Sequence, residues 1–86
     1  MSNSHHDQEL IPGKVPEEQF ELLLAGTSIR SEVLIAALRD HLVHGLRATD
    51  AWEKHGVNQS QFSRRLRVLQ EESARVRALS RFYRKR

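Results

Sequence analysis

The chain has 86 residues, no cysteine and a net charge of +3 at neutral pH, which allows one small domain and excludes a disulfide framework, a thiolate metal site and a cysteine nucleophile. Its longest apolar runs fall far short of the roughly 20 residues that span a membrane, and its first residues lack the basic and apolar regions of a signal peptide. We therefore expect a soluble, cytoplasmic protein.

The N-terminal residues 1–15 carry no periodic apolar pattern. We expect a flexible tail here, ordered in part near Leu10-Ile11 if these two side chains find a groove. A single helical domain is expected to follow over residues 16–86.

A first helix is expected to begin at Pro16, because the missing N–H of proline suits the first helical position. Phe20, Leu23 and Leu24 then give an apolar stripe at the i, i+3, i+4 spacing of a helix. Gly26 supplies a C-terminal stop.

A second helix is expected to start within residues 28–31, where either serine can cap it, and to run to His44 before Gly45. Its apolar residues cover more than one face, which is typical of a central helix with neighbours on two sides. No segment alternates with period two, and no Asn-Gly or Asp-Gly hairpin signal occurs. The chain is therefore predicted to be all-α, a small bundle of four to five helices.

The pattern of residues 48–66 predicts a helix-turn-helix within this bundle. A helix over 48–55 ends at Gly56, whose tolerance of positive φ allows a sharp turn. Asn58 is placed to cap the next helix, with Gln61 at the capping-box position. The apolar stripe that packs this next helix onto the one before comprises Val57, Phe62, Leu66 and Leu69. A short helix, a glycine turn and a polar, arginine-rich second helix are typical of this motif.

The charge of the chain is strongly divided. Residues 1–43 carry three basic and seven acidic residues, whereas residues 44–86 carry eleven basic residues, nine of them arginine, and four acidic ones. Arginine offers a planar fork of donors that suits phosphate oxygens and base edges. The basic half therefore favours double-stranded DNA as its partner. The residues expected to contact it, which face outward or sideways from the stripe, are Asn58, Gln59, Ser60, Gln61, Arg64, Arg65 and Arg67.

Trp52 bears on how the two helices of the motif pack. Trp52 occupies the position where helix-turn-helix sequences usually have a small residue, so we expect it to lie in the core or between helices.

Residues 71–73 are expected to break the helix that follows the turn. Ser73 is then expected to cap a last helix, which ends in the basic tip of residues 84–86. This tip either frays in solvent or contacts phosphate.

Five segments of the chain carry a family resemblance: Leu10–Gly13, Phe20–Leu24, Ser28–Gly45, Glu53-Lys54 and Phe62–Leu66. They resemble the PapB/FocB family of adhesin (fimbrial) operon regulators. The resemblance implies a transcriptional regulator of enteric bacteria that acts as an oligomer on AT-rich DNA, in the cytoplasm at the nucleoid. The family's basic residue at the start of the helix before the turn falls at Ala48 or Thr49. Its nearest match here is Arg47, which the resemblance adds as an eighth expected DNA contact.

Other functions have weaker support. The histidines lack a glycine-framed nucleophile, and no phosphate loop occurs, so we expect no enzyme, no cofactor and no small-molecule ligand. His41 and His44 beside Asp40 lack a third ligand, which favours a solvated face over a metal site. The alternative function is a helical adaptor whose basic face binds an acidic protein. RNA is a weaker third option, because the chain lacks an aromatic stacking platform.

The apolar residues of the first two helices also bear on assembly. Because they cover more than one face, we expect at least a dimer, built mainly from these two helices. The alternative is that the core of the monomer uses all of them.

Overall fold

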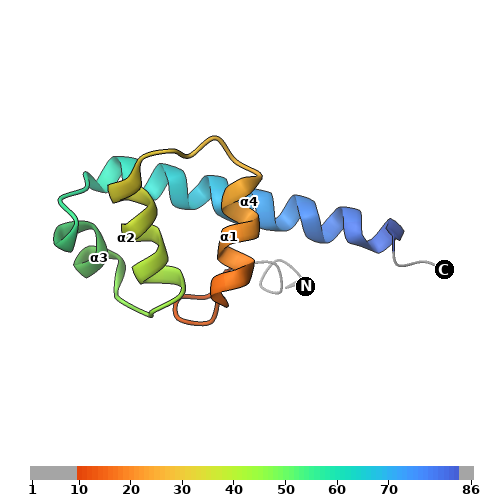
Figure 1. Ribbon diagram of the computed structural model, residues 1–86, viewed down its shortest axis with the longest axis horizontal. Helices are drawn as coiled ribbons and strands as arrows, with labels where there is room; N and C mark the ends of the chain where they lie inside the picture. The colour runs from red at the N-terminus through yellow and green to blue at the C-terminus, as the bar shows by residue number, and fades with distance from the viewer. Residues whose placement is uncertain (1–9, 84–86) are drawn as a thin grey trace, which may run out of the picture.

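Four α-helices make up the structure, a computed structural model that describes residues 10–83, with side chains to residue 80 (Figure 1). The ends of the chain, with most of the predicted tail and the basic tip, lie outside the described residues. The helices are α1 (Glu17–Ala25), α2 (Glu32–Leu42), α3 (Ala48–Lys54) and α4 (Gln59–Tyr83). α2 contacts the other three helices, and no strand occurs within residues 10–83. The prediction of an all-α bundle is confirmed, and none of these helices is both long and apolar enough to cross a membrane.

Local sequence accounts for the ends of the first helices. Ser31 precedes α2 in an extended conformation, and its hydroxyl oxygen accepts a hydrogen bond from the backbone N–H of Leu34 at 3.4 Å. Pro16 takes the N-cap position of α1 instead of the first helical position, and Gly26 ends that helix. α2 and α3 each end slightly earlier than the sequence predicts.

α4 is one continuous helix of 25 residues, so the predicted break at residues 71–73 is wrong. Ser73 caps nothing; it is only 4% exposed and lies against the bundle. Glu72 pairs with Arg75 one turn later, at 2.8 Å, and pairs at this spacing support a continuous helix. Since the segment contains no glycine or proline, its polar residues are not enough to stop the helix.

The core forms where α1, α2 and α4 meet. Its largest fully buried side chains are Phe20, Phe62, Leu38, Leu42 and Leu69. α2 turns most of its apolar residues into this core, so the broad apolar surface seen in its sequence is largely used within the monomer. Val33 is the large apolar residue of α2 that stays well exposed, at 54%.

Residues 10–15 pack against the bundle, whereas the sequence predicted a tail that is ordered only in part, near Leu10-Ile11. Leu10 and Val15 are 6% and 5% exposed. The last carbonyl groups of a helix have no partner within that helix. Here the backbone N–H groups of Gly13 and Val15 donate to the carbonyl oxygen of Leu42, at 2.8 and 3.2 Å. The segment therefore caps the end of α2, which explains its ordered position.

The side-chain amide of Gln70 fastens the same segment to α4. Its Oε1 accepts from the backbone N–H of Leu10 at 2.8 Å, and its Nε2 donates to the carbonyl of Leu10 at 3.4 Å. The segment thus connects α2 with α4 before the first helix begins.

Gly13→Ala should lower the free energy of unfolding more than Gly56→Ala does. Both changes place a β-carbon on a residue with positive φ, 78° and 67°, which costs about 1–2 kcal/mol. Only at Gly13 does the new carbon also meet the backbone, 3.1 Å from the Cα of Gly45, whereas nothing lies within 4 Å at Gly56. Urea unfolding followed by circular dichroism measures both losses. Equal losses would contradict the close backbone contact.

Candidate nucleic-acid interface

A four-residue turn joins α3 to α4. Gly56 within it has a φ of 67°, the left-handed conformation that glycine adopts without strain. Asn58 ends the turn, and its Oδ1 accepts from the backbone N–H groups of Ser60 at 2.7 Å and Gln61 at 3.3 Å. Asn58 therefore caps α4 as predicted. The arrangement is consistent with the predicted helix-turn-helix.

Phe62 holds this pair of helices on the bundle. Its side chain is 1% exposed. Its ring meets the Trp52 ring of α3 edge-to-face at 5.4 Å and the His41 ring of α2 at 5.6 Å. Trp52 is thus an inter-helix residue, as predicted. The small residue at the contact of α3 with its neighbours is Ala51, which is fully buried.

His41 is buried, which corrects the solvated face predicted for it and His44. It is 8% exposed, and its Nδ1 lies 2.8 Å from the carbonyl oxygen of Leu46. His41 follows the buried Leu38 by one helical turn, which places it on the core side of α2. His44 is exposed.

Asp40 of α2 makes a contact with the end of α3 and the turn that follows it. The sequence analysis did not predict this contact. Its Oδ2 lies 2.7 Å from the Nε2 of His55 and 3.1 Å from the Nζ of Lys54. The hydrogen bond from His55, followed by that from Lys54, holds the pKa of the Asp40 carboxyl below its ordinary value, against the opposing effect of burial. Because the partners come from different helices, helical spacing contains no signal for this contact.

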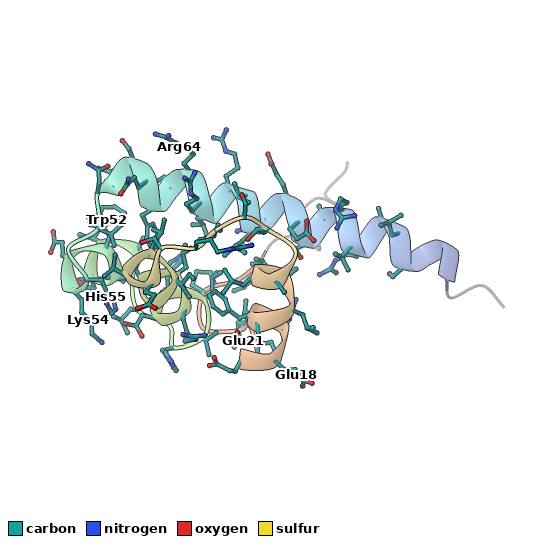
Figure 2. The ribbon with its side chains drawn as sticks, turned by 45° about the horizontal axis from the view of Figure 1, so that its top comes forward. Glu18, Glu21, Trp52, Lys54, His55 and Arg64 are labelled. Atoms are coloured by element: carbon teal, nitrogen blue, oxygen red, sulfur yellow. The ribbon has the colours of Figure 1, made fainter. Side chains whose placement is uncertain are left out.

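Seven of the eight predicted contact residues are exposed, all except Arg65. The side chain of Arg64 points away from the other three helices (Figure 2). Arg65 is partly buried, which corresponds to the sideways one of its two predicted positions. It follows Phe62 by one helical turn and precedes Leu69 by another, so it lies on the flank of α4 next to the core.

Arg47 lies apart from the other seven in the chain, at the N-cap of α3. Its side chain is 85% exposed, and its Nε lies 3.3 Å from a carboxylate oxygen of Asp50. The other seven residues fall within residues 58–67, in the cap and the first turns of α4.

The exposed start of α4 combines positive charge with an absence of carboxylates. No acidic residue occurs from residue 54 to residue 70. Among the described residues, ion pairs engage Arg39, Arg47, Lys54 and Arg75, but neither Arg64 nor Arg67. Their guanidinium donors are therefore available to an external anion.

Comparison with known proteins identifies relatives that match most of the chain. Residues 1–83 match the PapB family, described as adhesin biosynthesis transcription regulatory protein. The chain is 44% identical over 71 residues to the F1845 adhesin operon regulatory protein of Escherichia coli, covering 83% of this chain and 84% of that protein. It is 40% identical over 72 residues to the regulatory protein FanB of Escherichia coli, covering 84% and 73%.

A solved structure has the same fold. The crystal structure of E. coli FocB superposes with a TM-score of 0.82 at 35% sequence identity. The match covers 93% of this chain and 91% of FocB, so it includes all four helices.

Asp40→Asn should lower the free energy of unfolding at neutral pH by roughly 1–2 kcal/mol, because the amide loses the charge-assisted part of both bonds. The pKa of the Asp40 carboxyl is lower in the folded protein than in the unfolded chain. The ionised carboxylate therefore stabilises the fold at any pH above its unfolded-state pKa. This stabilisation is lost as the pH falls through its folded-state pKa. The two proteins should therefore converge in stability in acid. Thermal unfolding from neutral pH to about pH 2 measures this, with Glu71→Gln, an exposed carboxylate within α4, as control. A gap that is constant over the whole range would contradict the assignment.

Phe62→Ala should cost about 3–5 kcal/mol, because it removes a buried ring from the contact of three helices. Small domains hold about 5 kcal/mol or more in total, so most of the stability would be lost. Trp52 is the only tryptophan, and its fluorescence reports directly on this contact. Leu66→Ala, at a partly buried site on the same helix, should cost less. A Phe62→Ala protein with unchanged melting would refute the role of the ring.

Proposed function

Since the chain belongs to the PapB family of adhesin biosynthesis transcription regulatory proteins, we propose that it binds promoter DNA of a bacterial adhesin operon through the outward face of α4. This family consists of transcriptional regulators, not enzymes. The single observation that carries the proposal is the pair Arg64 and Arg67, exposed and without carboxylate partners in the described chain.

The start of α4 suits a groove of DNA. In a helix-turn-helix, the first turns of the second helix meet base edges while flanking side chains contact phosphates. Gln59 and Gln61 are exposed there, and glutamine amides pair well with adenine. This chemistry supports AT-rich sites as the target. Asn58 and Ser60 are their neighbours in the chain. The Oδ1 of Asn58 accepts the capping hydrogen bond from the backbone N–H of Ser60.

Phosphate contacts are assigned to the arginines. Arg64 and Arg67 lie one helical turn apart on exposed positions of α4, so both can face the same DNA backbone. Because Arg65 lies on the flank of α4, its side chain can contact DNA only from the side of that helix. Arg47 contributes from the start of α3, exchanging its contact with Asp50 for one with phosphate.

A single copy offers too few contacts for selective binding. Non-specific binding on such a scale has a dissociation constant of about 10⁻⁴–10⁻⁶ M at physiological salt. Joined copies make the second contact effectively intramolecular and raise the overall affinity. We therefore expect the protein to act as a dimer or larger oligomer on repeated sites, in the bacterial cytoplasm at the nucleoid.

Arg64→Ala and Arg67→Ala should each weaken binding to duplex DNA and reduce the salt dependence by about one phosphate contact. Fluorescence anisotropy with labelled promoter DNA over a salt series measures both, with circular dichroism to check folding. Lys14→Ala, which removes an exposed cation before α1, is the matched control and should change neither. Unchanged binding by the double variant would rule out this face. Salt-resistant binding to an acidic protein, without a DNA complex, would favour the adaptor function.

A further inference from the structure

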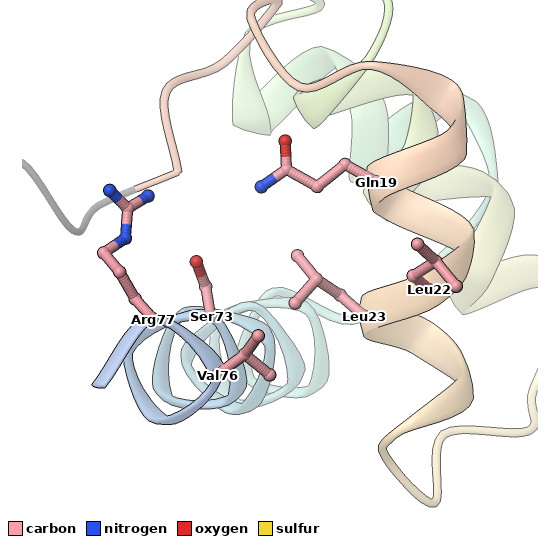
Figure 3. A pocket seen from close by; sticks show the side chains of 6 residues that line it. All are labelled: Gln19, Leu22, Leu23, Ser73, Val76 and Arg77. Carbon is pink, nitrogen blue, oxygen red and sulfur yellow. The ribbon is translucent and has the colours of Figure 1, made fainter. Parts of the chain in front are cut away.

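A groove lies between α1 and the C-terminal half of α4 (Figure 3). Its volume is about 270 Å³. Because the two helices are remote in sequence, no local motif indicates this groove, and the sequence predicted no small-molecule ligand. The side chains that line it are Gln19, Leu22, Leu23, Ser73, Val76 and Arg77.

Apolar side chains from both helices form part of the lining. Leu23 is buried, whereas Val76 and Leu22 are 44% and 70% exposed. Exposed apolar residues that gather around a concave surface are typical of a binding site. A ligand in the groove would cover part of this exposed area.

Three polar side chains share the groove with these apolar residues. In Figure 3 the amide of Gln19 and the guanidinium of Arg77 point to the same side, with the Ser73 hydroxyl between them. The side-chain hydrogen bonds and ion pairs within residues 10–80 engage none of the three. Among these described residues, no fully buried side-chain polar atom lacks a partner, so the unpaired hydroxyl of the largely buried Ser73 is reached from the groove.

We propose that the groove binds a small monocarboxylic acid with an apolar body, its carboxylate at Arg77 and its body against Leu23 and Val76. A guanidinium is a planar fork of donors that binds a carboxylate through two parallel hydrogen bonds. The Gln19 amide and the Ser73 hydroxyl supply further donors on the same side of the groove. An apolar lining with a few polar groups that fix orientation is the usual composition of a ligand site.

The surroundings of the groove limit the ligand to one carboxylate and a small body. Glu18 is exposed, lies one turn before Leu22, and has no ion pair among the described residues. A second carboxylate on the ligand would approach this negative charge, which disfavours a dicarboxylic acid. Drug-sized ligands occupy pockets of about 300–1,000 Å³, so this smaller groove suits an acid with a single ring or a short branched chain.

The site is separate from the proposed DNA-binding face. Arg77 follows Arg67 by ten residues, which places it about 15 Å further along α4. The ligand site therefore does not depend on the proposed function, and the two can be tested independently.

A nuclear magnetic resonance titration of the isotope-labelled full chain, without DNA, tests the site with 3-phenylpropionate and 4-methylpentanoate. The backbone amide signals of Leu23, Ser73 and Val76 should shift most, with a dissociation constant in the millimolar range or tighter for at least one acid. The uncharged 3-phenylpropionamide should bind about tenfold more weakly than 3-phenylpropionate, because it lacks the charge that pairs with Arg77. Absence of shifts in the groove with either acid at about 20 mM, or equal affinity for the acid and its amide, overturns the proposal.

A pair of arginine variants locates the carboxylate. Arg77→Gln should weaken the binding of 3-phenylpropionate about tenfold and leave that of the amide unchanged. Arg64→Gln is the matched control, since it removes an exposed arginine of the same helix outside the groove, and it should change neither. Equal losses in the two variants, or no loss in either, would overturn the assignment.

The same proteins separate this proposal from the proposed function. A chain that binds the acids but not DNA would count against the proposed function alone. A chain that binds DNA but neither acid would count against the ligand site alone.

Discussion

The contacts of the Phe62 ring determine which side of α4 faces solvent. The ring lies between Trp52 of α3 and His41 of α2, so the rotation of α4 about its own axis is fixed near its beginning. Side chains on a helix repeat every 3.6 residues. Burial of Phe62 and Leu69 therefore turns Arg64 and Arg67 to the opposite side. The exposed cationic face is thus a consequence of packing in the core.

Polar contacts around this core hold the supporting helices in place. Asp40 connects α2 to the end of α3 through Lys54 and His55, directly before the glycine turn. The segment before α1 caps α2 and bonds to Gln70 of α4. Both contacts join elements that are remote in sequence, and both position the helix whose outer face we propose to bind DNA.

Features with a local cause could be predicted from the sequence. The Asn58 cap, the glycine turn and the buried stripe each depend on residues a few positions apart, and the structure contains all three. Features that depend on distant partners could not. The burial of His41 and the bonding of Asp40 need the positions of other helices, and Glu72 with Arg75 continues a helix that polar residues were expected to interrupt. The contacts with DNA remain a prediction.

The measurement that tests the central claim most directly is a nuclear magnetic resonance titration of isotope-labelled protein with a duplex from the promoter of an adhesin operon. The amide signals of residues 58–67 should shift most, together with the side-chain signals of Arg64 and Arg67, while those of α1 should shift little. Shifts concentrated outside α3 and α4, or no shifts at low salt, would contradict the account.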